Sequence, residues 1–366
     1  MEYVQERVAT LHDLTGDAPD APTGDAAVVV PMADRELRTP AARRVLSELE
    51  AVDPGTVVVP LRAAPENVGA FRDWLASYDL PTTLLWCNGP GVADLLATHD
   101  LDGPAGKGRD VWLALGVAAD RADHVVVHDA DAKTYDATWV PRLLAPVAGE
   151  FSFAKGYYAR VEDDRLYGRL FRLFYAPLVA ALGERHDATV LDYLGAFRYA
   201  LAGEFAVTAD LARDLRVERE WGLEVGTLGG AFEHAGVEGT AQVDLGQYEH
   251  DHRGVDGPGG LSAMSEGVAA ALFRVCEANG VAPDYPSLAE RYRETADRFV
   301  RQYAADAAHN GLAYDRAAER EQVATYADAV APPDEGSVLP AWSDVALTPD
   351  AVVDAARPRV PRQPSD

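Results

Sequence analysis

The feature that most constrains the fold is a short apolar run that ends in two acidic residues. Residues 124–128 read His-Val-Val-Val-His, and Asp129, Ala130 and Asp131 follow directly. An uninterrupted run of this kind is typical of a central strand that is buried on both faces. Because side chains two residues apart point the same way, both carboxylates should face the carboxyl end of this strand, where open α/β sheets bind ligands.

Two carboxylates at such a position indicate a divalent cation. They repel each other unless a cation lies between them, and their hard oxygen atoms suit Mg²⁺ or Mn²⁺, which could in turn hold a diphosphate. The alternative is that Asp129 caps a helix and Asp131 is a solvated loop residue. An EF-hand is excluded, since Lys133 and Thr134 stand where the calcium loop needs an oxygen ligand and then glycine.

Strands and helices are expected to alternate along much of the chain. Apolar or alternating runs predict further strands at 26–30, 56–60, 82–87, 151–158 and 239–246. Amphipathic or strongly apolar stretches predict helices at 3–14, 37–49, 66–78, 92–98, 109–119, 139–147, 168–182, 204–215 and 223–234, and residues 258–330 are expected to be almost entirely helical. This alternation predicts an α/β fold with a doubly wound, mostly parallel sheet and helices on both faces.

Charge and cysteine content limit the classes of function. The formal net charge is −26 and the isoelectric point is near 4.6, so no basic stripe exists that could neutralise the phosphates of a nucleic acid. No apolar run is long enough to span a membrane, and the first residues do not resemble a signal peptide. Two distant cysteines, Cys87 and Cys276, fit a reducing compartment. We therefore expect a soluble cytoplasmic protein that binds no nucleic acid.

Lysine is almost absent from this acidic chain. The three lysines are Lys107, Lys133 and Lys155, and arginine supplies the other cationic side chains. An acidic surface with little lysine is typical of halophilic proteins, because salt at roughly 1 M shortens the Debye length to about 3 Å and screens self-repulsion. The acidity therefore reflects the solvent rather than the substrate. The lysines that remain all lie near Asp131 in the sequence, which makes them candidates for function.

Four residues could converge on the acidic pair. Lys107, between two glycines at a helix start, suits contact with a phosphate. His250 follows a predicted strand and could supply a nitrogen ligand. Glu224 is a carboxylate at a helix start, and Arg169 could clamp an anion. Each residue also has a plainer interpretation. Lys107 could be a surface lysine on a flexible loop, and His250 a solvated histidine. Glu224 could be an acid that satisfies the helix dipole, and Arg169 a charge on a helix surface.

The order of several short segments resembles that in the glucosyl-3-phosphoglycerate synthases. The matching segments are 106–108, 127–131, 155–160, 168–169, 198–205, 221–226, 242–246 and 248–250. The resemblance extends from about residue 26 to about residue 280. It implies a retaining glycosyltransferase of GT-A fold that moves glucose from a nucleotide sugar, usually UDP-glucose, to 3-phosphoglycerate. The product would be a precursor of the compatible solute glucosylglycerate.

The resemblance also implies roles for individual residues. Asp131 and His250 would hold Mg²⁺ or Mn²⁺ on the donor diphosphate, and Lys107 and Glu224 would act in catalysis. Donor contacts would come from Pro31, Lys107, Asp129, Ala130 and Asp131. Acceptor contacts would come from Gly168, Arg169 and Arg253. A homodimer is expected from the family.

Sequence pattern and composition, together with the extent of the resemblance, divide the chain into four regions. These are an N-terminal helix and linker (1–25), a GT-A catalytic domain (26–257), a helical region (258–330) and a tail expected to be disordered (331–366). The catalytic domain comprises a nucleotide-binding half (26–135) and an acceptor half (136–257).

Departures from the family pattern leave the substrates open. Arg35 replaces an expected acid, Cys87 and Asn88 stand where an aspartate would read the nucleoside, and Phe171 replaces a hydroxyl-bearing residue in the acceptor stretch. The alternatives are mannosyl transfer from GDP-mannose, transfer to another phosphorylated or lipid acceptor, and an inactive module that binds sugar nucleotides. A nucleotidyltransferase would need a glycine-rich loop after the first strand, and residues 30–33 contain no glycine.

Overall fold

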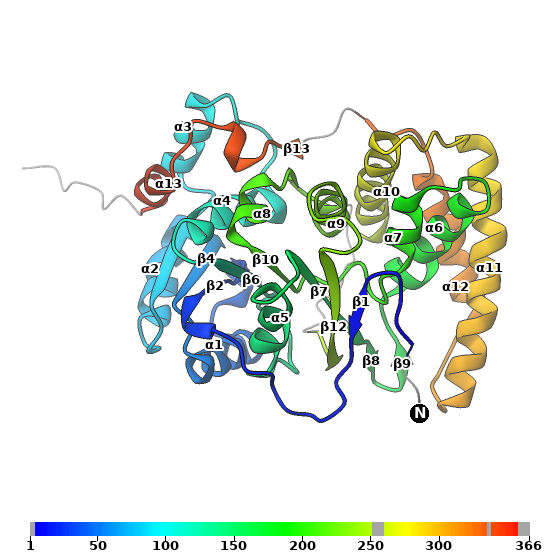
Figure 1. Cartoon of the computed structure of the whole chain (residues 1–366), viewed down its shortest axis with the longest axis horizontal. Coiled ribbons are helices and arrows are strands. Elements are labelled where there is room, and N and C mark those ends of the chain that lie inside the picture. The colour runs from blue at the N-terminus through cyan, green and yellow to red at the C-terminus, as the bar shows by residue number, and fades with distance from the viewer. Residues whose placement is uncertain (1–3, 251–259, 335–337, 358–366) are drawn as a thin grey trace, which may run out of the picture.

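A nine-stranded sheet forms the centre of the computed structural model, which describes residues 4–250, 260–334 and 338–357 (Figure 1). In sheet order the strands are β1 (Ala9–Leu11), β12 (Thr240–Gln247), β7 (Phe153–Ala159), β10 (Phe205–Thr208), β6 (His124–Val127), β2 (Ala26–Val29), β4 (Thr56–Arg62) and β3 (Met32–Ala33), and β5 (Thr82–Trp86) pairs with β4. Strand β10 is antiparallel to both neighbours, whereas the other pairings described in this sheet are parallel. The predicted mostly parallel sheet is confirmed.

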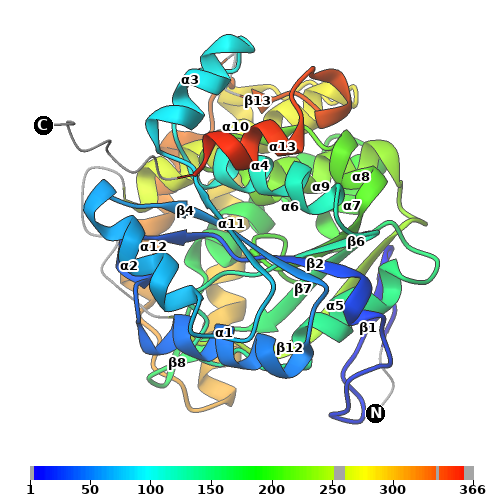
Figure 2. The same cartoon turned by 90° about the vertical axis from the view of Figure 1, so that its left-hand side faces the viewer.

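Helices cover both faces of the sheet, as predicted. On one face lie α4 (Lys107–Ala119), α8 (Ala209–Asp214) and α9 (Leu223–His234); on the other lie α1 (Pro40–Val52) and α5 (Trp139–Val147) (Figures 1 and 2). Helix α4 packs on β2, β4 and β6, and α5 packs on β6, β7, β10 and β12. Helix α2 (Pro65–Leu75) connects β4 to β5, and α3 (Pro90–Thr98) follows β5 and precedes α4. Because β6 is covered on both faces, its three valines are fully or almost fully buried.

A second group of helices stands beside the sheet, on the right in Figure 1. It comprises α6 (Ala176–Gly183), α7 (Thr189–Gly195), α10 (Leu261–Ala278), α11 (Tyr285–His309) and α12 (Arg316–Tyr326). A π-helical segment, η3 (Leu170–Tyr175), leads into α6, and its Phe174 packs against Tyr292 of α11 and Tyr326 of α12. The expected helical region is therefore confirmed for its described residues.

Short elements complete the fold. They are β8 (Val161–Glu162) paired with β9 (Arg165–Leu166), β11 (Val217–Glu218) paired with β13 (Val338–Leu339), the 3-10 turns η1 (Thr23–Asp25), η2 (Asp34–Glu36), η4 (Ala327–Ala329) and η5 (Trp342–Asp344), and α13 (Pro349–Ala355). Among the helices of the described ranges, none is long and apolar enough to cross a membrane.

Two predicted helices are wrong in whole or in part. The stretch predicted as a helix at 3–14 instead contains β1, which pairs in parallel with β12 at the edge of the sheet. The stretch predicted as a helix at 204–215 begins with β10, and only Ala209–Asp214 is helical. Residues 205–208 read Phe-Ala-Val-Thr, which suits a strand, and the neighbouring β6 and β7 supply the hydrogen bonds that make it one.

The C-terminal tail, which composition predicts to be disordered, is ordered where the structure describes it. Strand β13 pairs with β11, and α13 packs on α3 and α4. The Trp342 ring stacks on Trp112 of α4 with centroids 4.7 Å apart, and each indole N–H donates a hydrogen bond to a carbonyl of the other segment. Buried aromatic contacts thus outweigh the polar composition. Residues 335–337 and 358–366 lie outside the described ranges, and the division of the chain into four regions stays a prediction.

Candidate active site

A cavity of about 600 Å³ lies where several strands of the sheet end. Five of the residues singled out from the sequence line it: Lys107, Asp129, Asp131, Glu224 and His250. The acidic pair follows β6, His250 follows β12, and the other two residues occupy the first turns of α4 and α9. Residues that are far apart in the chain therefore share one cavity at the carboxyl edge of the sheet, which is where α/β folds bind ligands.

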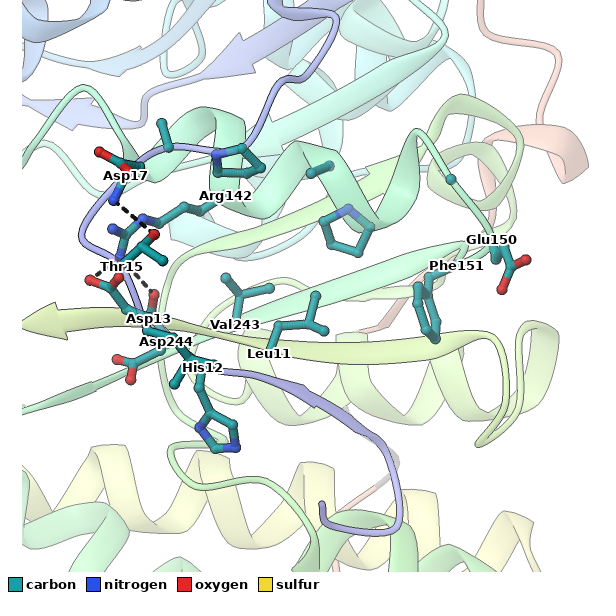
Figure 3. A pocket seen from close by; sticks show the side chains of 16 residues that line it. Leu11, His12, Asp13, Thr15, Asp17, Arg142, Glu150, Phe151, Val243 and Asp244 are labelled. Carbon is teal, nitrogen blue, oxygen red and sulfur yellow. Dashed lines mark hydrogen bonds and ion pairs between the residues drawn. The ribbon is translucent and has the colours of Figure 1, made fainter. Parts of the chain in front are cut away.

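A second cavity of about 600 Å³ lies under the N-terminal segment (Figure 3). Apolar side chains such as Leu11, Phe151 and Val243 line much of it, and an ion pair of 2.8 Å between Asp13 and Arg142 fastens the segment to α5. The described linings of the two cavities share no residue, and none of the predicted site residues lines the second one. We therefore take the first cavity as the candidate site.

Backbone contacts bring Asp131 and His250 together. The loops that carry them form a bridge between Ala132 and His250, and the Lys133 N–H donates to the Glu249 carbonyl at 2.8 Å. The His250 Nε2 atom then lies 2.9 Å from Asp131 Oδ2, and the Tyr248 hydroxyl donates to Asp131 Oδ1 at 3.4 Å. This pairing supports the sequence-based hypothesis that the two side chains act at one point.

The two side chains stabilise each other's charged form. Burial raises the pKa of Asp131, but the hydrogen bond and charge of His250, together with Lys107 and Arg35, lower that pKa below its ordinary value overall. Burial lowers the pKa of His250, whereas the Asp131 carboxylate raises it, and the net shift is upward. The two side chains thus form an ion pair in this structure. A metal cation could take the place of the proton between them and bind to both side chains.

Lys107 links the acidic pair to Glu224. Its Nζ lies 2.6 Å from Asp129 Oδ1 and 3.6 Å from Glu224 Oε1, and the lysine side chain is about one-third exposed. Although partial burial opposes its charge, the two carboxylates raise the pKa of Lys107 above its ordinary value. The lysine is therefore fully charged at neutral pH and available to an anion in the cavity.

Close packing fixes the start of α4, which carries Lys107. A Cβ on Gly108 would collide with the carbonyl oxygen of Glu218, and the Arg109 N–H donates to the Arg219 carbonyl at 3.0 Å. Glycine is required here because the two backbones touch. This contact holds the lysine beside the segment that leads to Glu224.

Two buried titratable side chains, Glu204 and Lys155, lie outside the described lining of the cavity, and the sequence analysis gave them no role in the site. Glu204 is fully buried, and neither carboxylate oxygen has a hydrogen-bond partner among the described residues. Burial, and then the charge of Asp129, raise the pKa of Glu204 to about 7. Lys155 donates to the Ala202 carbonyl at 2.5 Å, and burial lowers its pKa to about 8 against the opposing effect of Glu224 and Glu204.

The sequence held signals for this pair. Glu204 and Lys155 both lie in segments that match the family, and Lys155 is one of only three lysines. The register of the sheet explains their position, because Lys155 of β7 stands opposite Phe205 of β10. Gly203 is needed beside them, since a Cβ there would collide with the Asp129 carboxylate.

Arginine and tyrosine side chains to which the sequence analysis gave no role in the site complete the wall. The cavity is also lined by Arg35, Arg62 and Arg160 and by Tyr158 and Tyr248, whose rings stack with centroids 4.3 Å apart. Arg160 directly follows β7, so its place at the carboxyl edge of a predicted strand was the available signal.

Four residues predicted to contact donor or acceptor do not line the cavity. They are Pro31, Ala130, Gly168 and Arg169. Ala130 is buried between the two aspartates, and Arg169 Nε lies 3.0 Å from Glu319 Oε1 of α12. Arg253 lies outside the described residues.

The metal-ligating atoms in the cavity fit a divalent cation that also binds a substrate. Within the described ranges, no group of three or more histidine, cysteine, aspartate or glutamate side chains could hold a metal ion. Asp131 and His250 offer one oxygen and one nitrogen ligand. Mg²⁺ and Mn²⁺ sites with few protein ligands commonly take the rest from substrate phosphates and water, so the two side chains suit an ion that is bound together with a diphosphate.

The chain is similar to several known proteins, although no protein-family profile matches it. It is 34% identical over 353 residues to the glucosyl-3-phosphoglycerate synthase of Methanococcoides burtonii. The aligned region covers 89% of this chain and 87% of the relative. It is also 34% identical over 321 residues to that of Persephonella marina, covering 83% of this chain and 79% of the relative.

Solved structures extend the comparison to the fold. The glucosyl-3-phosphoglycerate synthase of Mycobacterium tuberculosis, in complex with Mn²⁺, UDP and phosphoglyceric acid, superposes with a TM-score of 0.56 at 23% identity over 76% of this chain and 88% of that chain. The same enzyme with Mg²⁺ and UDP gives a TM-score of 0.56 at 25% identity over the same shares. The fold is of the GT-A type. From the identity to curated relatives over most of its length, the chain belongs to the glucosyl-3-phosphoglycerate synthase family and is a glycosyltransferase.

Proposed function

We propose that this protein is a metal-dependent, retaining glycosyltransferase that moves glucose from UDP-glucose to 3-phosphoglycerate. The observation that carries the proposal is the cavity in which the Asp131–His250 pair lies beside Lys107 and Glu224. Relatives that share 34% identity over most of the chain carry the name of this activity. A structural relative was solved with Mn²⁺, UDP-glucose and phosphoglyceric acid.

On the donor side, Asp131 and His250 would hold Mg²⁺ or Mn²⁺ against the diphosphate. When bound, this cation would act as a Lewis acid on the departing nucleoside diphosphate. Lys107, kept charged by Asp129 and Glu224, would stabilise the negative charge that develops as the sugar leaves. Pro31, Asp129 and Ala130 are proposed donor contacts, as the family resemblance implies.

On the acceptor side, Glu224 would orient the sugar and the attacking hydroxyl. No protein nucleophile is required if the acceptor attacks from the face that the leaving group departs from. Gly168, Arg169 and Arg253 are proposed acceptor contacts, as the family resemblance implies. Arg169 would bind the acceptor through the N–H groups that its 3.0 Å Nε contact with Glu319 leaves available, because a guanidinium carries five donors.

The finer predictions follow from family membership and composition. We propose a homodimer in the cytoplasm that makes a compatible-solute precursor in a salt-adapted cell. The formal net charge of −26 supports the last point. Mannosyl transfer from GDP-mannose is the alternative for the donor, because Cys87 and Asn88 stand where an aspartate was expected to read the base.

The test is a product assay. The full-length protein is incubated in high salt with Mg²⁺, 3-phosphoglycerate and each of UDP-glucose, GDP-glucose, UDP-mannose and GDP-mannose, and products are identified by mass spectrometry. We expect a hexosyl-phosphoglycerate with UDP-glucose, and α-anomeric configuration by NMR for a retaining enzyme. A preference for GDP-mannose would replace the proposed donor, and no product from any pair would overturn the activity.

A matched pair of variants links the product to the cavity. Lys107→Met removes the charge beside the acidic pair, and Arg72→Met removes an exposed arginine that is not part of the cavity lining. Removing a preorganised charge that stabilises a transition state costs about 10²–10³-fold in kcat. We expect a loss of this size for Lys107→Met and none for Arg72→Met; equal activities would remove Lys107 from the proposed mechanism.

A further inference from the structure

Four lysine and arginine side chains line the cavity in the described part of the chain, and three of them have a close carboxylate partner. Lys107 lies 2.6 Å from Asp129, Arg35 Nε lies 2.5 Å from Glu36 Oε1, and Arg62 Nε lies 2.9 Å from Asp110 Oδ2. The fourth is Arg160. Its carboxylate contact is at 4.0 Å, between its NH2 atom and Glu162 Oε1, and this same oxygen accepts the His250 backbone N–H at 3.1 Å. Arg160 is therefore the least neutralised of the four cations.

The guanidinium of Arg160 is also under-used as a hydrogen-bond donor. Its one hydrogen bond to the described residues is a long one, 3.3 Å from NH1 to the Tyr199 hydroxyl. Its Nε atom is buried and has no partner among the described residues. The side chain is 19% exposed, and its guanidinium carbon lies 5.6 Å from the centre of the Tyr248 ring. A buried N–H without a partner costs free energy, which a ligand can recover by accepting it.

Arg160 contacts two tyrosines, one of which reaches the predicted metal-binding pair and the other the predicted acceptor segment. It sits over Tyr248, whose hydroxyl reaches Asp131, and its charge acts on His250. Its hydrogen-bond partner Tyr199 packs against the backbone of Gly168, where a Cβ would lie 3.0 Å from the hydroxyl oxygen. Gly168 begins the segment that the family resemblance connects with the acceptor. Arg160 thus stands between the metal-binding pair and the acceptor segment.

We propose that Arg160 binds an anionic oxygen group of the acceptor, a carboxylate or a phosphate, through its Nε and NH2 edge. The planar guanidinium presents two parallel N–H donors along this edge, which match the spacing of oxygens in both groups. Tyr199 acts as a positioning residue, because its hydroxyl holds the other corner of the guanidinium. The assignment rests on the proposed function, since it takes the acceptor to be a small anionic alcohol.

The test measures acceptor and donor affinity separately. Arg160→Gln, Arg160→Lys and the control Arg72→Gln are titrated by calorimetry with 3-phosphoglycerate in the presence of Mg²⁺ and UDP, and with UDP-glucose in the presence of Mg²⁺. Loss of a charge-assisted pair predicts an increase in the 3-phosphoglycerate Kd of about tenfold or more for Arg160→Gln. We expect a smaller increase for the lysine variant, none for the control, and an unchanged donor Kd in all three.

Two further acceptors identify the group that Arg160 holds. Glycerol 3-phosphate lacks the carboxylate of 3-phosphoglycerate, and glycerate lacks its phosphate. If Arg160→Gln weakens binding of 3-phosphoglycerate and glycerate only, the partner is the carboxylate; if it weakens 3-phosphoglycerate and glycerol 3-phosphate only, the partner is the phosphate. Either result supports the assignment.

The assignment is overturned if Arg160→Gln binds 3-phosphoglycerate like the unchanged protein, or if donor affinity falls by the same factor. Should Arg160→Gln fail to fold, Tyr199→Phe decides the matter, because loss of the hydroxyl should raise the acceptor Kd while the donor Kd stays the same. Failure of the proposed function gives a different result: the unchanged protein would bind no 3-phosphoglycerate and form no product.

Discussion

Burial changes the chemistry of His128, the residue that closes the central apolar run. Its side chain is fully buried, and neither ring nitrogen has a hydrogen-bond partner among the described residues. The ring lies edge-on to Tyr135, with centroids 5.1 Å apart. Burial lowers the pKa of His128 from its ordinary 6.5 to about 3, because the imidazolium cannot be solvated there. This residue is therefore a neutral core side chain.

This pKa shift predicts an acid-dependent loss of stability. Between pH 6.5 and 3 the unfolded chain binds a proton at His128 that the folded chain does not, so the free energy of unfolding falls as pH falls. Within this window, protonation of His128 in the unfolded chain lowers the free energy of unfolding by up to about 1.4 kcal/mol per pH unit. The His128→Phe variant lacks this protonation. We therefore expect the difference in free energy of unfolding between the unchanged protein and His128→Phe, measured with denaturant, to change with pH below 6.5. A pH-independent difference would contradict the buried neutral state.

At the scale of single residues, functional side chains could be predicted from the sequence only where a local pattern or a rare residue type distinguished them. Asp131 follows an apolar run and Lys107 is one of three lysines, and both line the cavity. Arg160 ends a segment that matches the family and follows a predicted strand, but its residue type alone did not distinguish it from the other arginines. Its importance depends on which partners it lacks, and partners are set by the packing of strands and loops that are distant in the sequence.

Among the elements, the C-terminal segment shows how distant packing overrides composition. Trp342 stacks on Trp112 in the middle of α4, and a Cβ on Gly116 would collide with its ring. Strand β13 pairs with β11, the strand that precedes the segment leading to Glu224. The C-terminal segment therefore supports both elements that carry Lys107 and Glu224.

Removal of the Trp342 side chain should accordingly destabilise the protein. Large-to-small substitution of a buried aromatic residue costs about 3–5 kcal/mol. We expect Trp342→Ala to lower the free energy of unfolding, measured in guanidinium chloride, by this amount. Leu14→Ala is the control, since Leu14 is an exposed apolar residue, and it should change stability by less than about 0.5 kcal/mol. Equal effects of the two substitutions would mean that the tail is not packed as described.

Element prediction succeeded where a pattern was local and failed where pairing was not. The helix at 139–147 was predicted with the bounds that the structure gives, because its apolar face is visible in the sequence. Strand β10 was predicted as part of a helix, because only insertion between β6 and β7 makes it a strand. The bounds of β1 and the order of the C-terminal segment likewise depend on partners that are more than 200 residues away.

For the whole molecule, the dominant feature is the net charge of −26. Like charges spread over the surface repel one another in the folded state, and salt weakens this repulsion by shortening the Debye length from about 10 Å at 0.1 M to about 3 Å at 1 M. The fold class and the family could both be predicted from sequence because they depend on the order of many elements and motifs. The substrate could not, because base, sugar and acceptor are read by a few contacts.

The charge predicts that salt stabilises the protein. We expect the unfolding temperature to rise when KCl is increased from 0.1 to 1 M. Sucrose at matched osmolality is the control, because it does not screen charge and should give a smaller rise. An unfolding temperature that stays constant or falls over this range of KCl would contradict adaptation of the surface to salt.

A cation shared by Asp131 and His250 is the centre of the proposed mechanism. Calorimetric titration of UDP-glucose with and without Mg²⁺ tests it in the unchanged protein, Asp131→Ala, His250→Ala and the exposed-site control Asp210→Ala. We predict that Mg²⁺ strengthens binding in the unchanged protein and the control, and that each of the other two variants loses this effect. Near-normal, Mg²⁺-dependent titrations of either variant would contradict the assignment of that side chain as a ligand.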